Sequence, residues 1–446
     1  MTQRYFGTDG IRGRVNKSPM TSETALRLAI AAARTFSPEG GRGVVIGRDT
    51  RRSGEMIEAA LVAGLTSMGL RPVLLGVVPT PAVALMARET GAALGIMVSA
   101  SHNKFQDNGL KLFSPEGIKF TDTVEAALEV AMGEAFTGEY AAPEAIGETS
   151  RMTGAASFYA NRCLETLGEE LDFSGLKIVL DCAHGAAFEV GPEAFRKLGA
   201  DLTVIGNAPD GLNINAGFGS TSTGALKAAV LETEAHIGIA FDGDADRLIV
   251  VDETGEEIDG DQIMALIATQ LHYTERLRGG GMVATVMSNM GLGEYLKSLG
   301  LKLARTKVGD RYVGEHMRQH GFNLGGEQSG HIILSDVSTT GDGLLAALQV
   351  LKTVSQSGEP VSKLTHVFDP APQELVNIRF TGTNPMETER VRAALQEAET
   401  YLGERGRMVV RKSGTEPLIR VMSEALEEDR MKTALNMVVD AVSAES

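Results

Sequence analysis

The chain has 446 residues, with 42 Lys and Arg against 58 Asp and Glu, so its formal net charge is −16. This length predicts about three domains, and the acidic excess repels nucleic acid and anionic membrane surfaces at long range. There is no apolar run of about 18 residues, so no membrane-spanning helix is expected. The start, MTQRYFGTDG, lacks the apolar region of a signal peptide. The only cysteines, Cys163 and Cys182, lie in no CxxC pair, which fits a reduced cytoplasm.

One pattern recurs along most of the chain. A short β-branched run meets a polar or glycine-rich turn and is followed by an alanine- and leucine-rich helical stretch. The pattern begins near Gly43, Arg71, Leu176 and Gly281. Strands that alternate with helices indicate parallel sheets with helices on both faces. The repeated unit is a whole α/β domain rather than a short solenoid repeat.

The last part of the chain has a different pattern. From about residue 370 we expect a strand at ELVNIRF, a helix at METERVRAALQEAETYL, two strands around the loop in RMVVRKSGTEPLIRVM, and a final helix at EDRMKTALNMVVDAV. This predicts a small α+β domain. The stretches GEYAAPEAIGETSR and FDPAPQ have the composition of connectors. We therefore expect domains at 1–150, 151–255, 256–368 and 369–446.

Three aspartates predict a metal site. Asp242, Asp244 and Asp246 alternate with Gly243 and Ala245 between two apolar runs. Carboxylates so close repel one another unless a hard cation such as Mg²⁺ or Ca²⁺ holds them. An EF-hand is rejected, because its sixth position would be Arg247 instead of glycine and an apolar strand follows directly. A solvated acidic turn is the alternative, and the flanking apolar strands disfavour it.

The stretch GIMVSASHN, residues 95–103, places Ser101 after an apolar run and beside His102. A serine hydroxyl is a weak nucleophile unless a base or a metal activates it. There is no G-x-S-x-G elbow, so an α/β-hydrolase triad is not expected. A phosphorylated Ser101 that faces Mg²⁺ is one interpretation, and a helix cap is another. Lys111 lies shortly downstream and could carry a proton or a charge.

Two further loops could bind polar groups. In RKSGTEPLIR, the guanidinium groups of Arg411 and Arg420 would match a phosphate, and the intervening loop supplies backbone N–H groups and hydroxyls. A simple hairpin turn is the alternative. In GGEQSGH, Glu327 and Ser329 could contact sugar hydroxyls, or the segment could be a structural turn. The cluster Arg48, Arg51 and Arg52 predicts either a solvated face or an interdomain salt bridge.

These motifs together carry a family resemblance. They are FGTDGIRG (6–13), SASHN (99–103), DGDADR (242–247), KVGDRYV (307–313), GEQSGH (326–331) and RKSGTEPLIRVM (411–422). In this order, over nearly the whole chain, they resemble the α-D-phosphohexomutase superfamily. The resemblance implies an α/β fold of three similar mixed α/β-sheet domains plus a smaller C-terminal α+β domain around a central cleft.

The resemblance also implies roles for the motif residues. Ser101 would be the phosphoserine, and one Mg²⁺ per chain would be held by a phosphoryl oxygen on Ser101 together with Asp242, Asp244 and Asp246. Arg247 would stabilise transition-state charge. His102 and Lys111 are candidate general acids or bases. The implied substrate contacts are Glu327, Ser329, His331, Arg411, Ser413, Gly414, Thr415 and Arg420. For His102 and His331 an orienting hydrogen bond is an equally weighted alternative, and Ser99 would be structural.

The form GEQSGH resembles the glucosamine branch, whereas the phosphomannomutase/phosphoglucomutase branch tends to have GEMSAH, so Gln328 and Gly330 carry much of this interpretation. The implied reaction interconverts glucosamine 6-phosphate and glucosamine 1-phosphate through glucosamine 1,6-bisphosphate, and its product would supply UDP-N-acetylglucosamine. A phosphatase, a non-catalytic phosphosugar-binding protein and a phosphoglucomutase/phosphomannomutase are the alternatives. Ser101 would first be phosphorylated by a kinase or by autophosphorylation. A homodimer is left open.

Overall fold

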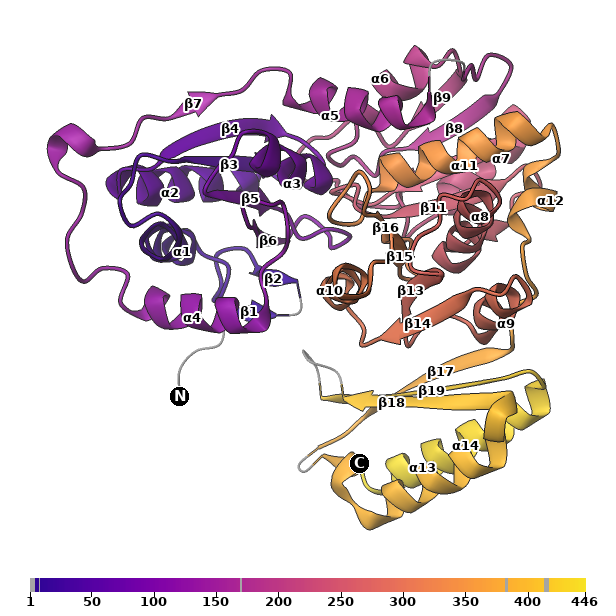
Figure 1. Ribbon diagram of the computed structural model, residues 1–446. Coiled ribbons are helices and arrows are strands. Elements are labelled where there is room, and N and C mark those ends of the chain that lie inside the picture. The colour runs from indigo at the N-terminus through magenta and orange to yellow at the C-terminus, as the bar shows by residue number, and fades with distance from the viewer. Residues whose placement is uncertain (1–4, 8, 169–170, 382–383, 413–416) are drawn as a thin grey trace.

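The computed structural model describes residues 5–7, 9–168, 171–381, 384–412 and 417–446. Four β-sheets follow one another along the chain, and helices flank each of them (Figure 1). The C-terminal sheet and its two helices form a separate unit at the bottom of the view (Figure 1). The fold is thus the predicted one, with three mixed α/β units and a smaller α+β unit.

The first sheet has seven strands in the order β1-β2-β6-β5-β3-β4-β7. In that order the strands are β1 (Phe6–Gly7), β2 (Gly10–Arg14), β6 (Asp107–Phe113), β5 (Leu94–Val98), β3 (Gly43–Arg48), β4 (Arg71–Val77) and β7 (Ser150–Arg151). Its helices are α1 (Ser22–Phe36), α2 (Ser53–Ser67), α3 (Thr80–Glu89) and α4 (Asp122–Gly133). The strand β5 is buried along its whole length, as its unbroken apolar sequence predicts.

The second sheet runs in the order β12-β11-β10-β8-β9 and the third in the order β14-β13-β15-β16. The second consists of β12 (Glu257–Ile258), β11 (Leu248–Asp252), β10 (Ile237–Phe241), β8 (Lys177–Asp181) and β9 (Asp201–Ile205), with helices α5 (Ala155–Leu164), α6 (Val190–Lys197) and α7 (Gly224–Thr233). The third consists of β14 (Lys302–Thr306), β13 (Gly281–Thr285), β15 (Leu324–Gly326) and β16 (Ile332–Leu334), with helices α8 (Gly260–Tyr273), α9 (Met290–Ser298), α10 (Asp310–His320), α11 (Gly343–Ser357) and α12 (Val361–Thr365).

One four-strand module occurs in all three sheets. The orders β4-β3-β5-β6, β9-β8-β10-β11 and β14-β13-β15-β16 each contain three parallel strands and a fourth that pairs antiparallel with the third. The alternation of strands and helices predicted the parallel strands. It did not predict the antiparallel strand, because that strand follows its partner through a short loop with no helix between them. In the second module, the apolar run after Arg247 predicted a strand, which is β11. These loops cover residues 99–106, 242–247 and 327–331, where three of the candidate motifs lie.

The C-terminal sheet is antiparallel, in the order β17-β19-β18, with β17 (Gln373–Arg379), β19 (Leu418–Ala425) and β18 (Gly406–Lys412). The helices α13 (Glu389–Leu402) and α14 (Glu428–Ala444) pack on it. Both helices lie where the sequence predicts them, and each packs one apolar face on the sheet. The buried side chains include Val391, Ala398, Leu402, Met431, Leu435, Val438 and Val442, and Leu395 is partly buried. This unit has its own hydrophobic core.

We propose domain boundaries near residues 150, 255 and 368. The strand β7 ends at residue 151 and still pairs with the first sheet, and β12 ends at residue 258 and pairs with the second. Among the described residues, no helix is both long and apolar enough to cross a bilayer.

The separate core of the C-terminal unit gives a stability prediction. Leu435 is 3% exposed in that core, whereas Leu375 on β17 is 44% exposed. Leu435→Ala should destabilise this unit by about 2–5 kcal/mol, because it leaves a cavity. Leu375→Ala should change its stability by less than about 0.5 kcal/mol. Differential scanning calorimetry should show a low-temperature transition for Leu435→Ala only. A uniform shift of the whole thermogram would contradict an independent core.

Candidate active site

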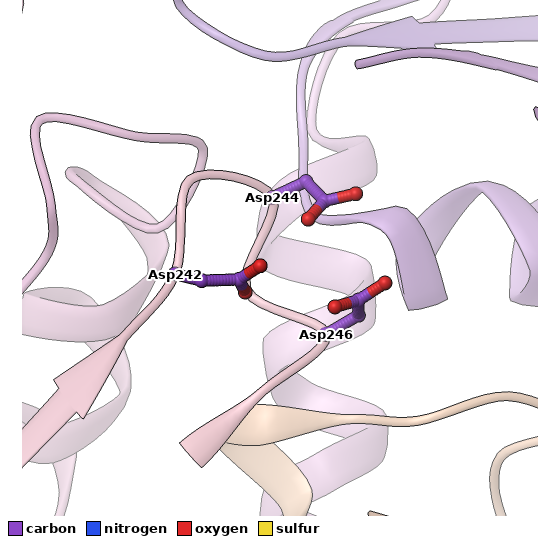
Figure 2. A group of neighbouring side chains, drawn as sticks. All are labelled: Asp242, Asp244 and Asp246. Carbon is purple, nitrogen blue, oxygen red and sulfur yellow. The ribbon is translucent and has the colours of Figure 1, made fainter. Parts of the chain in front are cut away.

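Asp242, Asp244 and Asp246 lie on the turn that joins β10 to β11, and their side chains converge (Figure 2). All three are buried. One carboxylate oxygen from each lies within 4.8 Å of the others. The turn is tight: Ala245 has a φ of +55°, and a Cβ on Gly243 would lie 2.6 Å from the carbonyl oxygen of Ser101. The small residues between the aspartates therefore allow three charges to converge on one point.

This convergence is costly without positive charge. Burial, together with Asp246 and Asp244, raises the pKa of Asp242 to about 8. Burial also raises the pKa of Asp246, but Lys111 and His331 outweigh it and hold that pKa well below its ordinary value. Asp244 Oδ1 and Asp246 Oδ1 are buried and have no hydrogen-bond partner among the described residues. Carboxylate oxygens that accept no hydrogen bond in a three-carboxylate group fit a hard cation such as Mg²⁺.

Ser101 lies in the equivalent loop of the first module and meets this turn. Its side chain is buried, and its Oγ donates a hydrogen bond to Asp242 Oδ2 at 2.5 Å. The serine and the aspartates are 141 positions apart, yet the fold brings them into contact. A helix cap does not describe Ser101, because no helix begins at that loop.

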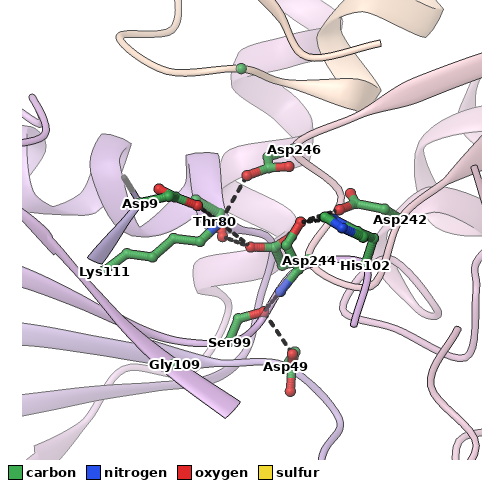
Figure 3. A network of polar contacts seen from close by, with 12 residues as sticks. Asp9, Asp49, Thr80, Ser99, His102, Gly109, Lys111, Asp242, Asp244 and Asp246 are labelled. Carbon is green, nitrogen blue, oxygen red and sulfur yellow. Dashed lines mark hydrogen bonds and ion pairs between the residues drawn. The ribbon is translucent and has the colours of Figure 1, made fainter. Parts of the chain in front are cut away.

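His102 and Lys111 differ in their charge. His102 Nδ1 lies 3.5 Å from Ser101 Oγ, and burial, Arg247 and Arg12 lower the pKa of His102 to about 4. Lys111 Nζ lies 2.7 Å from Asp244 Oδ2 and 2.9 Å from Asp246 Oδ2 (Figure 3). Burial lowers the pKa of Lys111, but these two carboxylates raise it well above its ordinary value. At neutral pH His102 is thus an uncharged acceptor and Lys111 a fixed cation.

A closed ring of alternating charges joins this group to two other domains. The six contacts are Lys111–Asp246 at 2.9 Å, Asp246–His331 at 3.5 Å, His331–Asp310 at 3.1 Å, Asp310–Lys119 at 2.6 Å, Lys119–Asp9 at 2.5 Å and Asp9–Lys111 at 3.5 Å. Burial lowers the pKa of His331, whereas Asp310 and Asp246 raise it to about 10. The backbone N–H of Gly341 lies 3.0 Å from His331 Nε2 and favours the neutral ring, because only an unprotonated nitrogen can accept this hydrogen bond. The two carboxylates outweigh this preference and favour the charged ring.

The loop at 327–331 belongs to the third module. Glu327 Oε1 accepts the backbone N–H of Gly309, burial raises the pKa of Glu327, and Ser329 is exposed. Gln328 Nε2 donates to Asp259 Oδ2 at 3.1 Å. Gly330 has a φ of +87°, and a Cβ there would overlap the carbonyl oxygen of Leu248. The two residues that distinguish GEQSGH from GEMSAH thus join the loop to Asp259 and to Leu248 in this chain.

Arg411 and Arg420 are directly paired across β18 and β19. Burial and the neighbouring Arg420 lower the pKa of Arg411. Arg420 Nε is buried without a hydrogen-bond partner among the described residues. Two adjacent guanidinium groups with a spare donor fit an anion such as phosphate. The other predicted members of this loop, Ser413, Gly414 and Thr415, lie outside the described residues.

Sequence reasoning missed several groups. Asp9, Lys119 and Asp310 complete the charge ring, and two of them lie in motifs, FGTDGIRG and KVGDRYV, that were noted for resemblance only. Arg51 was predicted to lie on a solvated face or in an interdomain salt bridge, which is wrong. It is fully buried and pairs with Asp49 of its own domain at 2.8 Å. No spacing signal in the sequence distinguishes Arg51 from its exposed neighbour Arg52.

Comparison with known proteins decides the family. Models described as phosphoglucomutase/phosphomannomutase domains I, II, III and C-terminal domain match residues 3–137, 157–255, 259–370 and 375–441. A curated phosphoglucosamine mutase of Hyphomonas neptunium is 75% identical over 444 residues, covering 100% of this chain and 99% of that one. The chain belongs to the phosphoglucosamine mutases of the phosphoglucomutase/phosphomannomutase family.

Solved structures of phosphohexomutases share the fold. A Burkholderia thailandensis phosphoglucomutase/phosphomannomutase family protein superposes with a TM-score of 0.83 at 23% identity, covering 98% of this chain and 97% of its own. Aspergillus fumigatus N-acetylphosphoglucosamine mutase, in complex with GlcNAc-6P and magnesium, gives a TM-score of 0.62 at 19% identity, with 100% and 96% covered. A variant of that fungal enzyme is in complex with glucose 1,6-bisphosphate, with a TM-score of 0.61 at 19% identity and 96% and 99% covered.

The three-carboxylate group predicts a metal response. Mg²⁺ should raise the melting temperature of this phosphoglucosamine mutase, because it relieves the repulsion among the aspartates. Asp244→Asn removes one charge and should weaken the apparent Mg²⁺ affinity by at least about tenfold. Asp252→Asn, also buried but at the far end of β11, should leave the affinity unchanged. Thermal shift measured over a Mg²⁺ titration tests this, and equal responses from both variants would disprove the site.

Gly330 gives a second prediction. Gly330→Ala should lower the free energy of unfolding by about 2 kcal/mol or more, because the methyl group meets the carbonyl of Leu248 in a left-handed conformation. Gly300 has a similar φ of +73° with open space around it, so Gly300→Ala supplies the strain without the clash. Urea denaturation measures both. If the two variants lose the same stability, the Leu248 contact does not require glycine at position 330.

Proposed function

We propose that this chain interconverts glucosamine 6-phosphate and glucosamine 1-phosphate through phosphorylated Ser101 and glucosamine 1,6-bisphosphate, with one Mg²⁺ per chain. The observation that carries the proposal is the 2.5 Å contact between Ser101 Oγ and Asp242, within a buried group of three carboxylates. A buried serine placed at a cation site is the arrangement that a phosphoserine enzyme requires. Binding alone would need no such nucleophile.

In the forward half-reaction, the bond between phosphorus and Ser101 Oγ breaks as a bond forms to O1 of glucosamine 6-phosphate. Asp242, Asp244 and Asp246 would hold Mg²⁺, which would supply positive charge to the transferring group when bound. The proton of the sugar hydroxyl needs an acceptor, and we propose the uncharged His102, whose Nδ1 lies 3.5 Å from Ser101 Oγ. In the second half-reaction the 6-phosphoryl group returns to Ser101.

Lys111 and Arg247 supply fixed positive charge. Burial lowers the pKa of Arg247, but Asp242 and Asp246 raise it, so its guanidinium group stays charged. Lys111 contacts the carboxylates directly and is protonated at neutral pH. We propose electrostatic stabilisation for both, because Asp244 and Asp246 keep Lys111 protonated. His331, enclosed by Asp246 and Asp310, is better placed to orient the site than to contact the sugar.

A mutase must hold a second phosphate that does not react. The paired Arg411 and Arg420 are suited to this, and Glu327 is near enough to act on the pKa of Arg411. We propose that Glu327 and Ser329 contact the sugar between the two phosphates. A phosphatase would not need this second site. The ligands of the fungal relative, GlcNAc-6P, magnesium and a hexose 1,6-bisphosphate, support the same ligand classes here.

The binding partners, the oligomeric state and the cellular location are predictions. A phosphosugar is the proposed small-molecule partner. A homodimer, and a kinase or autophosphorylation for the first phosphorylation of Ser101, remain predictions. The cytoplasmic location is a prediction from the two cysteines, Cys163 and Cys182.

Phosphorus NMR of glucosamine 6-phosphate with the protein, Mg²⁺ and a trace of 1,6-bisphosphate tests the function. Glucosamine 1-phosphate should appear without inorganic phosphate, and Ser101→Ala should reduce its rate by about 10³-fold or more, because the acceptor atom is lost. Ser114→Ala, beyond the other end of β6, is the matched control and should keep the wild-type rate. Inorganic phosphate as the sole product would indicate a phosphatase, and an active Ser101→Ala would exclude the phosphoserine.

A further inference from the structure

The backbone of Ser101 has an unusual conformation. Its φ is +51°, in the left-handed region that non-glycine residues rarely adopt. Such a conformation persists only where surrounding contacts enforce it. Its N–H donates to Ser99 Oγ at 2.9 Å, and Ser99 Oγ donates in turn to Asp49 Oδ2 at 2.7 Å (Figure 3). This places Ser99 in a structural role, as the resemblance implied.

The side chain of Arg51 binds the backbone of the same loop. Its side chain is fully buried, and Nε pairs with Asp49 Oδ2 at 2.8 Å. Its terminal nitrogens donate to four carbonyl oxygens at 2.6 to 3.0 Å. These belong to Ser101, Asn103, Lys104 and Asp107. One guanidinium group thus fixes the path of the loop from the phosphoserine position to the start of β6.

Asn215 reaches the same loop from the second domain. Its Nδ2 donates to the carbonyl oxygens of Ser101 and Asn103, both at 2.9 Å. Asn215 is itself 6% exposed, has a φ of +57°, and is anchored by its N–H on the carbonyl of Ala183. The carbonyl of Ser101 therefore receives one donor from its own domain and one from the domain that carries the aspartates.

We propose that Arg51 and Asn215 are positioning residues that fix Ser101 for phosphoryl transfer. The proposal rests on the proposed function, in which one oxygen atom, Ser101 Oγ, serves both half-reactions while the bisphosphate turns over. Ser101 Oγ must hold the same position relative to the three aspartates in both half-reactions. A displacement of about 1 Å can lower the rate by about 10²-fold. Neither side chain can contact substrate, because each is buried and its donors are engaged by the loop.

Asn215→Asp is the sharpest test. Aspartate has the same shape and tolerates the left-handed backbone, but a carboxylate oxygen replaces the amide donor and faces two carbonyl oxygens. We expect kcat to fall about 30- to 100-fold. We expect KM to change less than about threefold, since the substrate contacts are intact. Asn213→Asp makes the same change two positions away, where Nδ2 donates only within its own loop, to Ala208, and should keep the wild-type kcat.

Arg51→Lys is the companion variant. It keeps the charge but cannot reach four carbonyls and Asp49, so kcat should fall further than in Asn215→Asp. If this variant does not fold, Asn215→Asp carries the test alone. A wild-type kcat in Asn215→Asp overturns the proposal. An equal loss in Asn213→Asp, or a loss expressed mainly in KM, overturns it as well.

A second readout separates this proposal from the proposed function. Glucose 1,6-bisphosphate should phosphorylate Ser101, and mass spectrometry measures the rate without any need for isomerisation of glucosamine phosphates. Asn215→Asp should slow this labelling by about the same 30- to 100-fold. If the wild type is labelled but does not convert glucosamine 6-phosphate, the substrate assignment fails while the positioning role is still tested. Equal labelling rates in wild type and Asn215→Asp refute the positioning role.

Discussion

The repulsion among three buried carboxylates is the constraint on which the rest of this structure depends. Asp242, Asp244 and Asp246 converge within 4.8 Å. Such a group is stable only where cations face it. Lys111 contacts two of the three carboxylates, and His331 contacts Asp246 at 3.5 Å. The negative charge of the three carboxylates therefore both favours a metal ion and keeps Lys111 and His331 protonated.

The same constraint sets how the domains meet. The ring that runs through Asp9, Lys119 and Asp310 takes residues from the first, second and third units, so the site exists only where these three come together. The C-terminal unit is attached differently. Arg407 and Glu424 are paired across β18 and β19 and bind backbone groups at 286–290, while Arg411 and Arg420 are paired further along the same two strands. The arginines proposed to bind phosphate thus lie on a hairpin whose other end is held by the third unit.

Much of the fold could be predicted from the sequence, because its signals are local. The apolar run before Ser101 and the helical faces of residues 389–402 and 428–444 are patterns in the chain itself. The fourth strand of each module was not predictable from alternation, since it follows a loop instead of a helix. Arg51 was misplaced because burial is a tertiary property: Arg51 and Arg52 have the same side chain, and only the loop at 99–107 makes one of them internal.

Some site residues can be recognised in the sequence, whereas others become apparent only from their tertiary contacts. The aspartates and Ser101 stand out in the sequence because their chemistry is unusual at a strand end. Gln328 and Gly330 stand out by resemblance, and their contacts with Asp259 and Leu248 are tertiary, so the sequence does not show them. Asn215 carries no signal at all, because an asparagine in a glycine- and asparagine-rich loop looks like any turn residue. Its importance comes from the carbonyl of Ser101 that it meets.

The central claim is that the transferred phosphate passes through Ser101. Enzyme labelled with radioactive phosphate on Ser101 would be mixed with excess unlabelled glucosamine 6-phosphate and quenched at millisecond intervals. The account predicts that the label leaves Ser101 and appears in glucosamine 1,6-bisphosphate at least as fast as overall turnover, with none released as inorganic phosphate. Label that stays on Ser101 while glucosamine 1-phosphate accumulates would contradict it.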